Sequence, residues 1–235
     1  MADRLRGIRI LHEDPDVIVI EKPAGLLVQA LRHGHEPSVE TILTDYVRKG
    51  QWKSRKQVYL VHRLDRETSG VMMVAKTEAV QDYFRSNWNE LTEKTYLARV
   101  MGTLPAASGI FESYLYEDQD LFVRSTPDKS RGKYARTEWR TVVGTDPSSH
   151  VGTDPSARVG TDPSTLVEAI LKTGRKNQIR VQFADAGHPV LGDAKYGPSQ
   201  RGQTLCLHAW KLAFVHPHKR QKMFFETKLP NFAVL

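Results

Sequence analysis

Short apolar runs dominate the hydrophobic pattern of the chain, and they predict a fold richer in strands than in helices. The β-branched run Val17–Ile20 predicts a buried strand, which ends at the turn formed by Lys22, Pro23, Ala24 and Gly25. Further runs predict strands at residues 58–61, 71–75, 96–100, 135–143, 166–172, 205–210, 212–215 and 223–225.

Three segments have the apolar spacing of a helix instead. The first follows Ser38, which can cap it, and Gly50 can close it; its apolar positions are Val39, Ile42, Leu43, Tyr46 and Val47. The second opens at Thr77, with a predicted buried stripe of Val80, Phe84, Trp88 and Leu91. The third contains Ile179, Phe183 and Ala186 and stops at Gly187. Because strands and helices do not alternate strictly, we predict an α+β fold with a largely antiparallel sheet.

An internal repeat interrupts this pattern. The unit Val-Gly-Thr-Asp-Pro-Ser starts at Val143 and recurs at Val151 and Val159, which gives three copies of an eight-residue unit. Each copy offers one apolar side chain and otherwise turn-forming residues, whereas solenoid repeats are usually about 20 residues or longer. We therefore predict an expanded surface loop at about residues 143–165, and a dedicated binding element is the alternative.

Composition and charge restrict the class of protein. The chain has 235 residues with 40% hydrophobic and 26% charged, which is ordinary globular composition, and we expect a single domain over residues 1–235. Lys and Arg number 34 against 27 Asp and Glu, and the resulting charge of +7 favours a polyanionic partner. Cys206 is the single cysteine, and there is no signal-peptide core or membrane-length apolar run. We expect a cytoplasmic protein with no membrane association.

A polar segment between two predicted strands, His62–Gly70, has the residues best suited to catalysis. Its simplest interpretation is a surface turn in which Asp65 pairs with Arg63 and Arg66, an arrangement of little energetic value. Two features favour function instead. Leu64 gives the segment an apolar anchor, and loops held between rigid strands are where catalytic groups tend to lie.

Several ordered motifs resemble those of the RluA-type pseudouridine synthases. His62-Arg63-Leu64-Asp65 with Thr68-Ser69-Gly70 and Ala75-Lys76 is similar to the family signature. Blocks similar to the rest of the family pattern occur at residues 11–25, 94–98, 174–180, 187–197, 207–209 and 216–217. The resemblance extends over most of the chain. It implies a mixed, mainly antiparallel sheet with flanking helices and a basic cleft.

The resemblance also implies an isomerase that converts specific uridines of structured RNA, ribosomal or transfer, to pseudouridine. Asp65 is then the catalytic residue, which either attacks C1′ of the ribose or removes the C2′ proton. Arg180 pairs with this aspartate, and Tyr96 packs on the uracil ring. Ile179 and Leu205 are expected as apolar walls of the cleft, with a core role as the alternative for each. The target base must leave its stack. Arg63 is expected to fill the vacancy, with phosphate contact or an ion pair as its alternative; Arg66 and Lys76 are expected to bind RNA with it.

The reaction is redox-neutral, so we expect no cofactor and no metal site. The histidine pairs His33/His35 and His216/His218 have metal-compatible spacing, but such pairs are common in proteins without metal sites. RNA is the expected partner, with no obligatory protein partner and a monomeric state. Lys49, Lys53, Arg55 and Lys56 form one rim of the RNA site or merely a solvated face.

Two other functions use the same residues. A catalytically silent RNA-binding module would share the fold, but the chain retains Asp65, Tyr96 and Arg180. A hydrolase would need a second carboxylate about 5–10 Å from Asp65, and no feature of the sequence nominates one.

Overall fold

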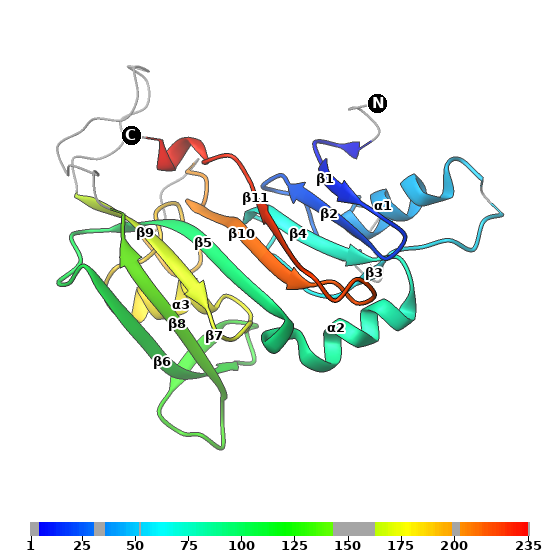
Figure 1. Ribbon diagram of the computed structural model, residues 1–235. Coiled ribbons are helices and arrows are strands. Elements are labelled where there is room, and N and C mark those ends of the chain that lie inside the picture. Colours follow the sequence, from blue (N-terminus) through cyan, green and yellow to red (C-terminus); the bar gives the residue numbers. More distant parts are fainter. Residues whose placement is uncertain (1–4, 31–35, 52, 143–162, 199–202, 235) are drawn as a thin grey trace, which may run out of the picture. The chain divides into compact units, whose positions relative to one another are not determined.

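The computed structural model describes residues 5–30, 36–51, 53–142, 163–198 and 203–234 (Figure 1). These residues form two compact units. Unit 1 comprises Met1–Lys94 and Ala209–Thr227, and unit 2 comprises Thr95–His208 and Lys228–Leu235. The expectation of one domain over the whole chain stays a prediction. Among the described residues, no helix combines the length and apolar character needed to cross a bilayer.

Unit 1 is built on strands in the order β1 (Arg9–Glu13), β2 (Val17–Lys22), β4 (Ser69–Ala75) and β10 (Leu207–Val215), the last beginning two residues inside unit 2. β3 (Tyr59–Leu60) also pairs with β4, and β11 (Lys222–Glu226) pairs with β10. β2 and β4 run antiparallel with Ile18 opposite Val74 and Ile20 opposite Met72. All four of these side chains are fully buried, so these strands form the core of the unit.

The two helices of unit 1 begin where the sequence predicts. α1 (Val39–Arg48) has a capping box in which Ser38 and Thr41 exchange hydrogen bonds. α2 (Glu78–Leu91) is capped by Thr77, but its predicted stripe is only half correct. Val80 and Phe84 are buried, whereas Trp88 and Leu91 are half-buried. The reason is Asn87, whose φ of −137° interrupts the helix and changes the direction of its last turn.

Unit 2 has its strands in the order β5 (Thr92–Met101), β9 (Ser164–Leu171), β8 (Lys133–Thr141), β6 (Ser108–Glu117) and β7 (Val123–Thr126). The first three residues of β5 belong to unit 1. The pairs β6–β7, β6–β8 and β8–β9 are antiparallel. α3 (Gln178–Asp185) is the helix of this unit among the described residues, and a short 3₁₀ turn (Asn231–Ala233) lies near the C-terminus. Because the described residues form three α-helices beside the strands, the α+β class is confirmed.

Residues 143–162 of the repeats lie outside the described residues, so the predicted loop stays a prediction there, whereas its last two residues, Ser164 and Thr165, already belong to β9. The strands that flank them are neighbours in the sheet. Thr141 of β8 lies opposite Val167 of β9, and the Val142 N–H donates to the Leu166 carbonyl at 2.9 Å. The repeats therefore connect the adjacent ends of two antiparallel strands.

Candidate active site

The segment that carries Asp65 is a short loop of unit 1 between β3 and β4. Asp65 is half-buried, and its carbonyl accepts the Thr68 N–H at 3.2 Å. Leu64, the preceding residue, is 7% exposed, so its predicted role as the apolar anchor of the loop is confirmed. Asp65 thus follows a buried side chain and begins a hydrogen-bonded turn, which fixes its backbone.

A buried lysine holds the other side of Asp65. Lys22, at the end of β2, is fully buried, and its ammonium donates to three backbone carbonyls: Pro23 at 2.9 Å, Leu26 at 2.8 Å and Arg66 at 3.0 Å. Burial lowers the pKa of Lys22 to about 8, against the opposing attraction of Glu67 and Asp65. The lysine therefore ties the turn after β2 to the residue next to Asp65.

Arg66 reinforces the same junction. Its carbonyl also accepts the Gly25 N–H at 2.8 Å, its Nε donates to the Gly25 carbonyl at 3.1 Å, and its guanidinium pairs with Glu36 at 3.3 Å. The structure thus gives Arg66 partners within the protein. Its expected contact with RNA stays a prediction.

His62 fixes the start of the loop. Its Nε2 accepts the Met73 backbone N–H at 3.0 Å, so the proton of the neutral ring is on Nδ1. The residue is half-buried, and its ring stacks on Trp88 with centroids 4.6 Å apart. Burial, followed by the charge of Lys94, holds the pKa of His62 well below its ordinary value. His62 is therefore a neutral acceptor, which suits an anchor better than an acid–base group.

Gly70 closes the loop where the chain enters β4. Its φ is +114°, and a Cβ at this position would lie 2.1 Å from the Ala209 carbonyl oxygen of β10. Only glycine permits both the backbone conformation and this close approach. The glycine of the signature is thus required by packing.

The two remaining cations predicted to bind RNA differ in their surroundings. Arg63 is exposed in the loop beside Asp65, and its role stays a prediction. Lys76, just after β4, donates to the Glu13 carboxylate at 2.9 Å and to the Asp14 carbonyl at 2.8 Å. Lys76 therefore joins the end of β4 to the β1–β2 connection, and any contact with RNA would compete with these bonds.

In unit 2, Arg180 has a partner that the sequence analysis did not assign. It lies in the first turn of α3, is 6% exposed, and forms a two-fold ion pair with Asp193. Its Nε donates to Oδ2 at 2.8 Å and its Nη2 to Oδ1 at 2.7 Å. Burial would raise the pKa of Asp193, but the bonds from Arg180 and from the backbone of Lys195 and Tyr196 lower it. The predicted pairing of Arg180 with Asp65 stays a prediction.

Buried amides set the position of α3. The Gln178 Oε1 accepts from the Thr173 hydroxyl at 2.7 Å and from the Arg175 N–H at 3.0 Å, while its Nε2 donates to the Arg136 carbonyl at 3.0 Å. Gln182, one turn later, accepts from the Thr137 hydroxyl at 2.6 Å. Gln182 is thus a packing residue of the core. Together the two amides fix the turn that carries Arg180.

The other cleft residues implied by the resemblance are all buried. Tyr96 of β5 is 9% exposed, and the suggested apolar walls Ile179 and Leu205 are 3% and 5% exposed. These burials fit the core role that was the alternative for Ile179 and Leu205. The stacking of Tyr96 on uracil stays a prediction.

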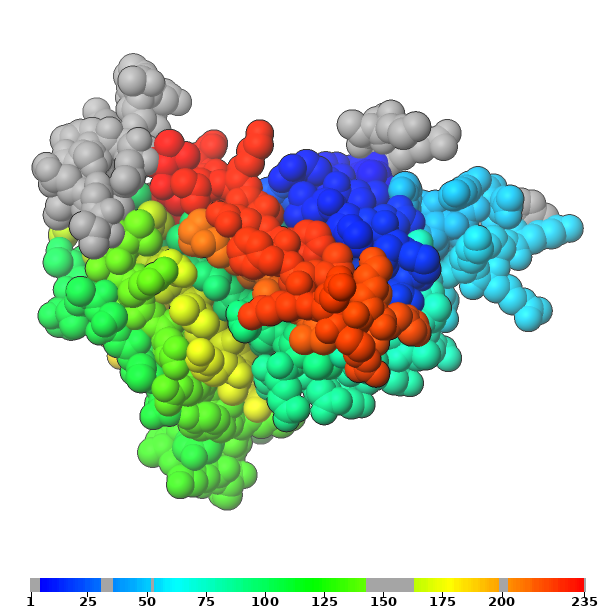
Figure 2. All heavy atoms as spheres, viewed as in Figure 1, coloured from blue at the N-terminus to red at the C-terminus, as the bar shows by residue number. Residues whose placement is uncertain are grey.

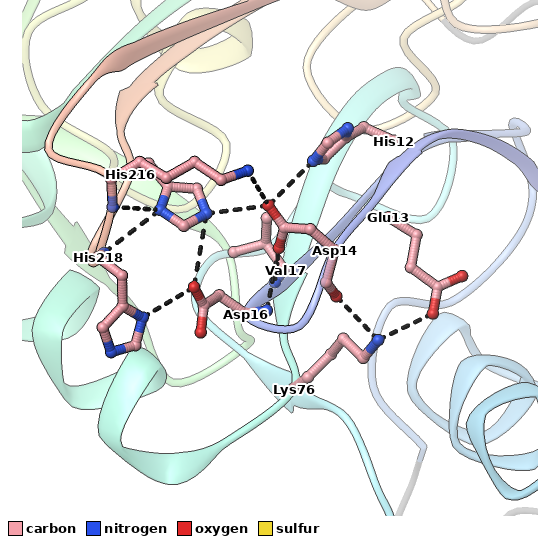
Figure 3. A network of polar contacts seen from close by, with 9 residues as sticks. His12, Glu13, Asp14, Asp16, Val17, Lys76, His216 and His218 are labelled. Atoms are coloured by element: carbon pink, nitrogen blue, oxygen red, sulfur yellow. Dashed lines mark hydrogen bonds and ion pairs between the residues drawn. The ribbon is translucent and has the colours of Figure 1, made fainter.

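A second polar cluster of unit 1 surrounds Asp14 (Figure 3). Its Oδ2 accepts from Lys219 at 3.0 Å and lies 2.9 Å from the His216 Nε2 and 3.1 Å from the His12 Nε2. Burial would raise the pKa of Asp14, but the bonds from the Val17 backbone, His12 and Lys219 hold it well below its ordinary value. These contacts join the β1–β2 connection to the end of β10.

Asp14, Asp16 and His216 present their ligand atoms within 4.8 Å of one another, which raises the question of a metal site. The His216 Nδ1 accepts the backbone N–H of His218 at 3.3 Å and of Lys219 at 3.1 Å. The neutral ring must then carry its proton on Nε2, the atom that faces both carboxylates. A metal there would need a doubly deprotonated ring, so this cluster fits a hydrogen-bond network and not a metal site.

Comparison with known proteins adds independent findings. Residues 16–185 match the sequence profile of the family described as RNA pseudouridylate synthase. The chain is 32% identical over 235 residues to ribosomal large subunit pseudouridine synthase D of Nitrosomonas europaea, covering 95% of this chain and 62% of that protein. It is 32% identical to an uncharacterized RNA pseudouridine synthase of Aquifex aeolicus, covering 95% and 70% of the two chains. The dual-specificity RNA pseudouridine synthase RluA of Yersinia pestis is also 32% identical, covering 92% and 97%.

Solved structures resemble the fold. Human RNA pseudouridylate synthase domain containing 1 matches with a TM-score of 0.73 and 21% identity, covering 96% of this chain and 85% of that one. Human RNA pseudouridylate synthase domain containing 4 matches with a TM-score of 0.68 and 26% identity, covering 98% and 92%. The chain spans about six-tenths of the length of the Nitrosomonas relative.

Proposed function

Because the chain belongs to the RNA pseudouridylate synthase family, we propose that it converts uridine to pseudouridine in RNA. The observation that carries the proposal is the fixed loop around Asp65. Leu64 anchors the loop on one side of the aspartate, and Lys22 binds the Arg66 carbonyl on the other. A half-buried carboxylate on a rigid loop is suited to act at one defined atom of a substrate.

The proposed reaction breaks the C1′–N1 bond of a uridine and forms a C1′–C5 bond. The proton on C5 is lost and N1 gains one, so atoms and electrons balance without a redox partner. The Asp65 carboxylate either attacks C1′ or removes the C2′ proton; both routes need it ionised. Tyr96 is proposed to pack on the detached uracil, and Arg180 to assist Asp65 while remaining bound to Asp193.

The proposed substrate is structured RNA, ribosomal or transfer. The relatives named above include one ribosomal large subunit enzyme and one with dual specificity. A paired uridine must leave its stack before a carboxylate reaches C1′. Arg63, exposed beside Asp65, is the residue proposed to fill the vacancy.

The test uses bulk RNA transcribed without modification and incubated with the protein in the absence of added cofactor. We expect pseudouridine to form without release of free uracil, and Asp65→Asn to abolish it while RNA affinity and the melting temperature stay near wild type. Turnover of Asp65→Asn within tenfold of wild type would refute the role of Asp65. Binding without turnover by the wild type would indicate the silent RNA-binding module, and released uracil would indicate a hydrolase.

A further inference from the structure

One short segment holds most of the excess charge of the protein. Residues 48–57 contain five Lys and Arg and no Asp or Glu, while the whole chain has a net charge of +7. We call the described residues of this segment, 48–51 and 53–57, the basic loop. It begins at the last residue of α1, so Arg48 and Lys49 lie at the helix C-terminus, where the helix dipole favours positive charge.

Backbone and side-chain hydrogen bonds give the basic loop a defined conformation. Lys49 takes up a left-handed conformation with φ of 51°, and its N–H donates to the Tyr46 carbonyl. The Arg48 Nε then reaches forward to the Lys56 carbonyl at 3.0 Å and closes the loop. At its end, the buried Val58 donates its N–H to the Thr44 hydroxyl of α1 at 3.3 Å. The charges therefore lie on a preformed surface.

The charged ends of the loop face solvent. Lys49, Lys53, Arg55 and Lys56 are all exposed, and Figure 2 shows the light-blue segment that contains them projecting beyond α1. Against the effect of burial, bonds from Lys76 and Tyr46 and a smaller attraction from Lys49 lower the pKa of the Glu13 carboxyl, so the charge of Lys49 is partly compensated. Lys53, Arg55 and Lys56 are three exposed cations within four consecutive residues. Three neighbouring exposed cations on one ordered loop suit a row of phosphates.

We propose that the basic loop, through Lys53, Arg55 and Lys56, binds backbone phosphates of the substrate RNA. The inference rests on the proposed function for its choice of polyanion, and it assigns the loop to affinity and not to chemistry. Phosphate contacts position a nucleic acid without reading its sequence. The loop should therefore strengthen the binding of any structured RNA and leave the reaction of a bound uridine unchanged.

The experiment compares two triple variants of equal net charge. One is Lys53→Gln/Arg55→Gln/Lys56→Gln. The control, Arg124→Gln/Lys172→Gln/Lys222→Gln, removes three exposed cations that are ion-paired with Asp118, Glu138 and Glu93. Binding of an unmodified tRNA transcript is measured between 50 and 300 mM NaCl, together with kcat and KM for pseudouridine formation in unmodified bulk RNA.

For the basic-loop variant we expect Kd at 100 mM salt to rise at least about tenfold. The slope of log K against log[salt] should become shallower by about 2–3, as the loss of three phosphate contacts requires. KM should rise with Kd, and kcat at saturating RNA should stay within about twofold of wild type. The control should keep the wild-type slope, because its cations are already neutralised.

Three results would overturn the inference. These are an unchanged salt slope in the basic-loop variant, an equal loss in both variants, and unchanged RNA affinity with lost binding to phosphatidylserine vesicles, which would assign the loop to a membrane surface. The binding assay needs no turnover. If the wild type proves inactive but the salt slope still depends on the loop, the proposed function fails and this inference stands.

Discussion

Replacing Lys22 by methionine tests whether the bonds around Asp65 stabilise the fold or act in the chemistry. Methionine has a similar volume but neither charge nor donor, so the substitution removes the three bonds to the carbonyls of Pro23, Leu26 and Arg66. Because the side chain is fully buried, water cannot replace those donors without the loop opening.

The expected loss of stability follows from two opposing terms. Three hydrogen bonds from a charged donor are worth about 1.5–3 kcal/mol each, or about 5–9 kcal/mol together. Against this, burial of the ammonium lowers the pKa of Lys22 from 10.5 to about 8, a penalty of about 3 kcal/mol that methionine does not have. The free energy of unfolding of the variant should therefore be about 2–6 kcal/mol lower than that of wild type, and its melting temperature about 6–18 °C lower.

Activity should respond differently from stability. Leu64, His62 and the Gly25 N–H still hold the loop in the variant, so kcat per folded molecule should fall less than about fivefold at temperatures well below melting. The assays are thermal melting and single-turnover pseudouridine formation at low temperature. An unchanged melting temperature would refute the stabilising role, and a hundredfold loss of kcat in a stable variant would assign Lys22 to catalysis.

The pH dependence of stability in wild type and in Lys22→Met gives an independent check. Between pH 8 and pH 10.5 the unfolded chain keeps the Lys22 proton while the folded protein loses it, so the unfolded state binds more protons. Folding stability from this group therefore rises with pH across that window. The stability of wild type relative to Lys22→Met should grow between pH 8 and pH 10, measured by urea unfolding.

Three further outcomes are expected. Arg180→Met should lose about 3–5 kcal/mol of stability as well as turnover, because Asp193 becomes a buried carboxylate without its guanidinium, and a melting temperature equal to wild type would contradict that. Asp14→Asn should be less stable than wild type at pH 7. Because the pKa of Asp14 is lowered in the folded state, the difference in free energy of unfolding between the two proteins should shrink as the pH falls below about 4. A difference that stays constant with pH would exclude ionisation of Asp14 as the cause. Deleting residues 143–158, which leaves one repeat, should shift the melting temperature by only a few degrees and retain catalysis. The reason is that halving the length of a loop changes its closure free energy by only about 0.6 kcal/mol. A large loss of stability would show that the repeats pack into the fold.

Local signals in the sequence predict the elements that have a strong apolar pattern. Ser38 and Thr77 cap helices where predicted, and the buried runs that form β2 and β4 have no polar interruption. β6 and β7 were missed because their pattern is weak. In β6 only Leu115 is fully buried, so most of its side chains give no apolar alternation to read.

Interruptions by charge misled the prediction at β10. Residues 205–210 and 212–215 were predicted as separate strands, divided by Lys211, yet β10 runs through this position. Lys211 lies 3.5 Å above the Trp210 ring and faces Glu226 of β11. A lysine whose ammonium lies over an aromatic ring and pairs with a carboxylate of the neighbouring strand does not break a strand.

The positioning residues of the site were not predictable in the same way. Lys22 binds the carbonyl of Arg66, 44 residues away, and every residue type offers a carbonyl, so no sequence pattern marks the acceptor. Arg180 and Asp193 are 13 residues apart in the sequence. The resemblance implied Asp65 as the partner of Arg180, and no sequence pattern pointed to Asp193. Such pairs depend on the path of the chain, which local propensity does not determine.

In both units a buried charged side chain holds a residue of the candidate site. In unit 1 the residue beside Asp65 is held through a buried ammonium on backbone carbonyls, and in unit 2 Arg180 is held by a buried carboxylate. Each of these polar groups has partners within its own unit, and these partners help to fix its orientation before substrate binds. It follows that substitutions at Lys22 or Asp193 act first on folding, whereas Asp65, whose neighbours on both sides are fixed, is the position where activity should be lost without stability.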